Sequence, residues 1–178
     1  MAAAAACLIA SSASAATVKY EYNDVKGRDS SARADLFKLE VSDEIGKIDT
    51  TVEVNFKETT TNIVDDQLIA KAGTSFNYKN IRFAPRVEFG RTFRPGNDGN
   101  FVGIEGKLSS PTPIQNLTAT VGVRRRQTLN NMTGQNTLRL EGSTEYALTS
   151  KYSIGAAYYR TSGDVHSDIF GGYLKVRF

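Results

Sequence analysis

From residue 17 onward, apolar side chains recur at every second position, with charged or polar side chains between them. A period of two is that of a β-strand with one apolar face and one polar face. Ten such segments can be counted, over residues 18–22, 37–41, 48–56, 68–78, 81–89, 102–108, 117–123, 138–146, 152–158 and 170–178. The pattern therefore predicts an all-β fold of about ten strands, with eight or twelve strands as alternatives.

The connections between these segments alternate in length. Long polar connections fall near 24–32, 58–66, 94–100, 129–136 and 161–168, and short ones near 42–47, 79–80 and 149–151. Long loops on one side and short turns on the other are typical of outer-membrane barrels. Aromatic side chains near the strand ends fit the girdles of such barrels, and closure removes the sheet edges that lipid cannot satisfy.

We therefore expect residues 16–178 to form a single closed antiparallel transmembrane β-barrel of the bacterial outer membrane. An even number of strands would place both termini and the short turns in the periplasm, and the long loops outside the cell. Pro85 falls on the lipid face of the fifth segment, where it removes a backbone donor and predicts a bulge.

Residues 1–15 have the character of a targeting segment. A short apolar stretch is followed by small residues, and Ala13-Ser14-Ala15 matches a cleavage site. We interpret this segment as a secretory signal peptide, although no Lys or Arg precedes the apolar stretch. Cys7, the only cysteine, lies within it, so the exported chain would have neither disulfides nor thiolate metal sites. No cofactor and no metal site is expected.

Overall charge excludes some functions. The chain has 22 Lys and Arg residues against 19 Asp and Glu residues, a formal net charge of +3. This balance argues against a nucleic-acid binder. After residue 15 there is no run of 18 apolar residues, which excludes a spanning helix.

If the apolar faces meet lipid, the charged faces line the lumen. The basic candidates are Arg82, Arg86, Arg124, Arg126, Arg139, Lys175 and Arg177. The acidic candidates are Glu21, Glu40, Glu53, Glu88, Glu105 and Glu141. Residues 1–80 carry 9 basic and 12 acidic groups, and residues 81–178 carry 13 and 7, so one wall should be acidic and the other basic. Two interpretations stay open: an arginine track that passes small anionic hydrophilic solutes, or ion pairs that plug the interior.

Two further groups of residues have expected membrane partners. Arg91, Arg125 and Arg160 occupy lipid-face positions near the expected outer surface, where guanidinium groups suit the phosphates of lipopolysaccharide. The chain ends on an alternating strand that closes on Phe, which resembles the signature recognised by the barrel-assembly machinery. The residues of this assembly signal are Tyr173, Val176 and Phe178.

A family resemblance adds a solute class. The stretches 18–24, 36–41 and 51–57 resemble the opening strands of the oligogalacturonate-specific porins. The resemblance implies a small monomeric barrel of Gram-negative bacteria whose basic interior passes acidic oligosaccharides. That family has twelve strands in a longer chain, so the ten counted here would make a narrower barrel.

An enzymatic role has little support in the sequence. The single histidine, His166, lies between Asp164 and Asp168, and the Asp-x-His pattern resembles the dyad of the omptin proteases. Those barrels use a second acidic pair, for which only Asp65 and Asp66 could be offered here. We therefore expect no enzyme, but a porin-like channel for small, anionic hydrophilic solutes. The alternatives are a non-conducting structural or surface-binding barrel and, with less support, an outer-membrane hydrolase.

Overall fold

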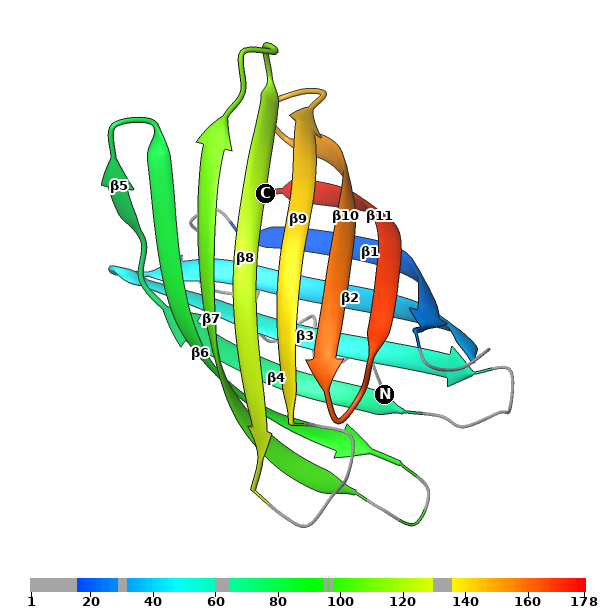
Figure 1. Cartoon of the computed structure of the whole chain (residues 1–178). Helices are drawn as coiled ribbons and strands as arrows, with labels where there is room; N and C mark the ends of the chain where they lie inside the picture. The colour runs from blue at the N-terminus through cyan, green and yellow to red at the C-terminus, as the bar shows by residue number, and fades with distance from the viewer. Residues whose placement is uncertain (1–15, 29–31, 60–64, 95, 97, 130–135) are drawn as a thin grey trace.

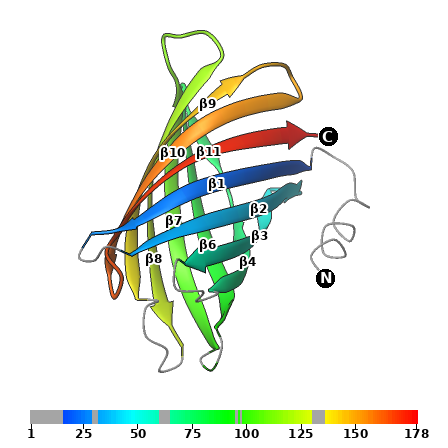
Figure 2. The ribbon, with the colours of Figure 1, turned by 90° about the vertical axis from the view of Figure 1, so that its right-hand side faces the viewer.

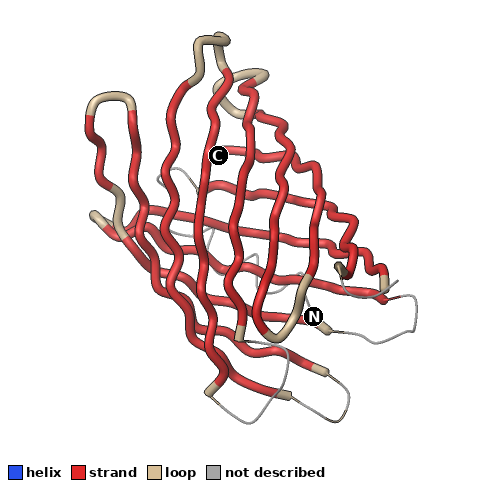
Figure 3. The backbone as a smooth tube through the Cα atoms, in the orientation of Figure 1, coloured by secondary structure: helices blue, strands red, loops and turns tan. Residues whose placement is uncertain are grey.

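The computed structural model describes residues 16–28, 32–59, 65–94, 96, 98–129 and 136–178 (Figure 1). The predicted signal peptide at 1–15 lies outside the described residues. Within the described ranges the chain forms strands, turns and loops, with no helical segment (Figure 3). None of these ranges contains a helix long and apolar enough to cross a membrane.

The strands form one closed antiparallel barrel (Figure 2). They are β1 (Thr17–Gly27), β2 (Arg33–Ile45), β3 (Ile48–Thr59), β4 (Asp66–Gly73), β5 (Phe76–Tyr78), β6 (Ile81–Phe93), β7 (Gly99–Pro111), β8 (Leu117–Thr128), β9 (Thr137–Ala147), β10 (Tyr152–Gly163) and β11 (Ser167–Arg177). Closure comes from the pairing of β1 with β11 and of β4 with β6. β5 continues β4 along the same neighbour, β6, so the barrel has ten strands and one short extra strand. The predicted fold is confirmed.

Pro85 explains the break between β4 and β5. Thr74 donates its N–H to the Pro85 carbonyl at 3.3 Å, but proline has no N–H to return the bond. Gly73 pairs with Arg86 before the break and Phe76 with Phe83 after it, so two residues separate the paired positions on each strand. The register is therefore unshifted, and the bulge expected at Pro85 is wrong. The lost donor interrupts the ladder without inserting a residue.

The order of the connections follows the prediction, whereas their lengths follow it only in part. The turns β2–β3, β5–β6, β7–β8 and β9–β10 lie at one end of the barrel with the described ends of the chain, where Phe178 N donates to Ala16 O at 3.0 Å. At the other end, β10 reaches Gly163 and β11 begins at Ser167, leaving only residues 164–166 as a loop. The turn at 112–116 is longer than this loop. Polar residues such as Thr161 and Ser167 are buried in the strands near the loop end, and for this reason composition alone misplaced the boundary.

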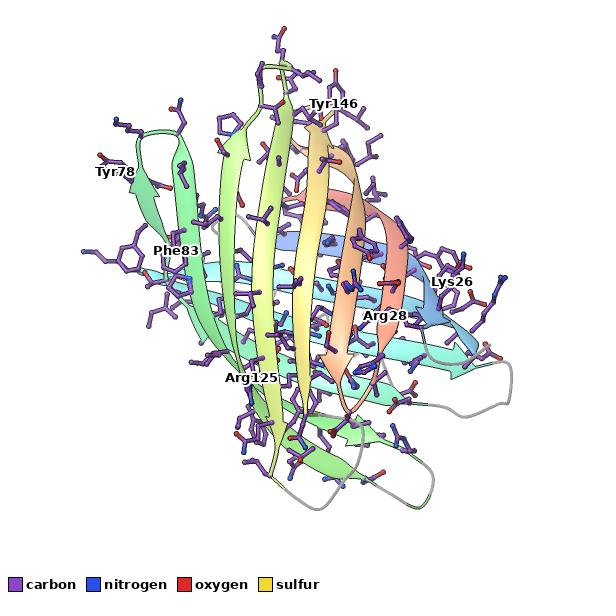
Figure 4. The ribbon with its side chains drawn as sticks, viewed as in Figure 1. Lys26, Arg28, Tyr78, Phe83, Arg125 and Tyr146 are labelled. Atoms are coloured by element: carbon purple, nitrogen blue, oxygen red, sulfur yellow. The ribbon has the colours of Figure 1, made fainter. Side chains whose placement is uncertain are left out.

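The two faces of the wall have the predicted character. Outward side chains are apolar and exposed over the middle of the strands, as with Val87 (60%), Ile104 (63%) and Val121 (59%). Tyr78 and Tyr146 lie near the turn end, as the girdle prediction requires (Figure 4). The inward face carries most of the buried charges. The alternation of the sequence therefore assigns most charged side chains to the correct side of the wall.

Candidate functional site

A chain of ion pairs runs around the inner wall at mid-height. The Lys71 ammonium group lies 2.7 Å from Glu53 and 3.3 Å from Glu105. Lys38 lies 3.6 Å from Glu21 and 3.9 Å from the same Glu53. These five side chains come from β1, β2, β3, β4 and β7, and all are buried. Carboxylates and ammonium groups thus alternate along one inner wall of the barrel.

The network continues around the second half of the wall. Lys107 on β7 lies 3.0 Å from Glu141 on β9 and 3.6 Å from Glu105. Arg126 on β8 donates two hydrogen bonds, of 2.5 and 3.2 Å, to the Glu88 carboxylate on β6. Such a two-pronged pair is a strong charge-assisted contact. Basic and acidic side chains are therefore paired with each other in both halves of the barrel wall.

At this level little space is left among the charged side chains. The space left among the charged side chains, which we call the mid-lumen cavity, has a volume of about 10 Å³. Its charged lining residues are Lys38, Lys71, Glu105, Lys107, Arg124, Arg139 and Glu141. A cavity of this size holds about one water molecule. The space that these residues enclose therefore holds nothing larger than a water molecule or a single small ion.

Several inward side chains nearer the loop end are apolar, which the sequence analysis missed, and they stand among buried polar side chains such as Asn23, Thr92 and Thr161. A buried apolar cluster on β1, β2, β10 and β11 extends from the loop end to mid-height, with the partly buried Leu36 packed against it. Its members are Val25, Ala34, Ala157, Tyr159, Ile169 and Tyr173. Phe101 and Ile69 are also fully buried near the loop end. The sequence signal was available: in the stretch Phe101-Val102, adjacent apolar residues cannot both face lipid.

Two of the inward aromatic rings occupy space left by glycines. A Cβ atom on Gly90 would collide with the Phe101 ring, and one on Gly155 would collide with the Tyr173 ring. Tyr159 instead uses its hydroxyl, which donates a 2.6 Å hydrogen bond to the buried Glu21 carboxylate. This hydrogen bond connects the apolar cluster to the ion-pair network.

Toward the turn end the barrel opens into a vestibule of about 880 Å³. Its basic lining residues are Lys19, Arg82, Arg86, Lys107, Lys175 and Arg177, and its acidic ones are Glu40, Asp43, Glu44, Asp49, Glu141 and Glu145. The numbers of basic and acidic groups are equal. The vestibule therefore has no net preference for anions from formal charge alone.

The predicted basic track is divided among several partners. Arg82 lies 3.4 Å from Asp49, while Lys175 and Arg177 share Glu145, each at 3.1 Å. These three residues line the vestibule. Arg124, Arg126 and Arg139 lie deeper, on β8 and β9. Arg86 also lines the vestibule, and its Nε is buried with no hydrogen-bond partner in the described part of the chain.

The predicted acidic set is brought together. Glu21, Glu53, Glu88 and Glu105 are buried at mid-height within the network. Glu40 lies 3.8 Å from Lys38, and Glu141 pairs with Lys107. Whether any of these residues contacts a passing solute stays a prediction.

The three predicted rim arginines face outward near the loop end. Arg91 lies 3.2 Å from Asp98, and Arg160 faces Asp168 in the register of β10 and β11. Arg125, near the loop end of β8, is exposed and has no ion pair with a described residue (Figure 4). Apolar grooves of about 800 and 700 Å³ flank it, with Ala72, Val87 and Ile104 common to both.

The assembly-signal residues lie on both faces of β11. Tyr173 points inward and is buried, with its hydroxyl donating to the Thr144 carbonyl at 3.1 Å. Val176 has the outward parity of Leu174, and Phe178 is 75% exposed. These positions leave the proposed recognition by assembly machinery as a prediction.

The candidate enzymatic residues lie in the short β10–β11 loop. The His166 carbonyl accepts a hydrogen bond from Arg28 N at 3.0 Å, and the Asp164 carboxylate accepts one from Asn136 N at 3.1 Å. In the described ranges no group of three or more His, Cys, Asp or Glu side chains is placed to hold a metal ion.

Comparison with known proteins identifies the fold. No family model matches the chain, and no curated protein matches it. Among solved structures, the β-domain of the Bordetella autotransporter BrkA matches with a TM-score of 0.55 at 9% identity, over 90% of this chain and 98% of that one. The fold is that of an outer-membrane β-barrel.

Two further solved structures show how widely this fold is used. The translocator domain of the autotransporter NalP from Neisseria meningitidis matches with a TM-score of 0.54 at 9% identity, over 92% of this chain and 87% of that one. The KdgM porin matches with a TM-score of 0.51 at 12% identity, over 91% and 99%. Because a porin and two autotransporter domains all match with TM-scores between 0.51 and 0.55, the fold does not distinguish conducting from non-conducting roles.

Proposed function

We propose that this chain is a barrel of the bacterial outer membrane whose lumen is blocked by side chains, so that it does not act as an open diffusion pore. Its turns and termini would lie in the periplasm. The observation that carries the proposal is the mid-lumen cavity, which has a volume of about 10 Å³. The non-conducting alternative of the sequence analysis therefore becomes the first candidate. Such a barrel would bind partners or lipid at the membrane surface, through its loop end and its outward-facing rim.

Opening the lumen would cost free energy, because buried ion pairs would have to separate. Moving Lys71 aside separates it from Glu53 and Glu105 together, and the three side chains are nearly solvent-free. Breaking a buried ion pair by removing one partner costs about 3–5 kcal/mol. Nearer the loop end, the fully buried Phe101 and Ile69 side chains occupy further interior space.

Rearranging the ion pairs would give the second candidate, a channel for small anions. The vestibule favours this second candidate, because Lys107 and Glu141 line both the vestibule and the mid-lumen cavity. The two spaces are therefore adjacent. One solved KdgM structure is described as a complex with disordered oligogalacturonate, an acidic sugar chain. At 13% identity that likeness supports the fold only.

Single-channel recording separates the two candidates. The refolded chain in planar bilayers should give no discrete current steps, while flotation with vesicles and heat-modifiable migration show that it is folded and inserted. A positive control with Lys71→Ala, Glu105→Ala and Phe101→Ala removes bulk from the lumen together with one cation and one carboxylate, so that Glu53 keeps Lys38 and Lys107 keeps Glu141, and it should conduct. Discrete current steps from the wild-type chain would overturn the proposal that the lumen is blocked. Reversal potentials with Arg124→Gln would then test the anion channel.

For the outward rim, we propose lipopolysaccharide as the partner of Arg125. Its guanidinium group is exposed beside apolar grooves that are floored by small residues such as Ala72, Pro85 and Gly106. A phosphate at the guanidinium with an acyl chain in a groove would complement both features. We also propose that the final strand is recognised during assembly through Phe178.

A further inference from the structure

The mid-lumen cavity has an unusual balance of charge. Five basic side chains line it, and only two carboxylates, Glu105 and Glu141, do so. Both carboxylates are already engaged: Glu105 lies 3.3 Å from Lys71, and Glu141 lies 3.0 Å from Lys107. Lys38 is directed to Glu21 and Glu53 instead. Two of the five cations, Arg124 and Arg139, remain.

Arg124 and Arg139 are direct neighbours. They face each other in the register of β8 and β9, and both side chains line the mid-lumen cavity. Arg124 is 8% exposed, and its nearest carboxylate is that of Glu88, at 3.8 Å from its Nε. Arg139 stacks on the Tyr159 ring at 4.7 Å and has no ion pair with a described residue.

Both arginines also have unsatisfied donors. The Nε atoms of Arg124 and Arg139 are buried and have no hydrogen-bond partner among the described residues. Buried guanidinium donors without an acceptor carry a desolvation cost, and two like charges at close range add repulsion. The site therefore lacks a compact acceptor with negative charge.

We infer that a single small monovalent anion of the size of chloride or bromide binds in the mid-lumen cavity beside Arg124 and Arg139. A halide ion accepts several N–H bonds from any direction and would offset the charge excess. A cavity with room for about one water molecule favours a monatomic halide over the larger sulfate, phosphate and sugar carboxylate groups. The ion could enter from the vestibule, because Lys107 and Glu141 line both spaces. This structural anion site does not depend on whether the barrel conducts.

Thermal unfolding at constant ionic strength tests the site in solution. As sodium chloride replaces sodium gluconate around the refolded barrel in zwitterionic detergent, the midpoint should rise by a few degrees and saturate. The Arg139→Gln variant should lose this rise. The matched control Arg82→Gln, in the vestibule, should keep it. A wild-type midpoint that is the same in chloride and gluconate, or an equal rise in Arg139→Gln, would overturn the inference.

A crystal grown in sodium bromide tests the position independently of any variant. An anomalous difference peak in the mid-lumen cavity, together with the saturating shift in solution, supports the site. A water molecule without anomalous signal there overturns it. A bromide peak without any shift in solution would mean adventitious binding at crystal concentration only, and it overturns the inference as well.

Discussion

The Lys71 ammonium group on β4 lies 2.7 Å from the Glu53 carboxylate on β3, and each side chain is at most 2% exposed. Glu105 on β7 approaches the same ammonium group to 3.3 Å. Because these groups have left water, each charge depends on its partners for compensation. Lys71 therefore joins two carboxylates across β6, which lies between β4 and β7 in the wall.

Replacing Lys71 by Met should destabilise the barrel strongly, because Glu53 and Glu105 would remain buried with less positive charge beside them. We expect the free energy of unfolding to fall by about 3–5 kcal/mol, measured by urea titration in lipid vesicles. The control Lys26→Met removes an exposed lysine that lies 3.8 Å from Asp24, and it should change stability by about 0–1 kcal/mol. Adding Glu53→Gln to Lys71→Met should recover part of the loss. Equal losses for Lys71→Met and Lys26→Met would contradict the role given to the buried pair.

Alternation was enough to predict the wall but not the filling of the lumen. Outward residues such as Val87 and Ile104 alternate with buried charges such as Glu88 and Glu105, so the two faces could be assigned from the sequence. Which lysine meets which carboxylate depends on the stagger between strands, and a period of two carries no information about stagger. The sequence alone therefore does not decide between an open track and a plug.

The apolar cluster was missed for a different reason. Val25 lies between Asp24 and Lys26, and Ile169 follows Asp168, so each stands at an inward position close to a loop. A rule that assigns every apolar residue to the lipid face cannot predict these inward-facing apolar side chains. Near the loop end the rule weakens: charged side chains such as Lys26 and Arg125 face outward (Figure 4), and some apolar side chains face inward.

Gly90 offers a direct test of this apolar filling. A Cβ at this position would overlap the Phe101 ring, so Gly90→Ala should force the ring to move and cost about 1–3 kcal/mol of unfolding free energy. The control Gly142→Ala places a methyl group where no heavy atom lies within 4 Å, and it should be near neutral. Reducing the ring with Phe101→Leu should lessen the effect of Gly90→Ala. If both alanine variants unfold at the same urea concentration, Phe101 does not pack on Gly90 as described.

The rim arginines should differ in how much each contributes to lipid binding. Arg91 already has Asp98 at 3.2 Å, and Arg160 faces Asp168, whereas Arg125 has no ion pair with a described residue. Arg125 is therefore the most available of the three for a lipid phosphate. We expect lipopolysaccharide to raise the unfolding midpoint of the wild-type barrel in vesicles, and Arg125→Gln to remove most of that rise.

The size of the effect at each rim arginine separates phosphate binding from ordinary surface charge. An exposed guanidinium–phosphate contact contributes about 1 kcal/mol at most, so Arg125→Gln should lower the lipopolysaccharide-dependent gain by up to that amount without changing stability in phosphatidylcholine alone. Arg91→Gln and Arg160→Gln should lower it less, because their carboxylate neighbours already offset their charge. Arg177→Gln, in the vestibule, is the matched control and should leave the gain unchanged. A full lipopolysaccharide response in Arg125→Gln would show that the exposed arginine and its grooves do not bind this lipid.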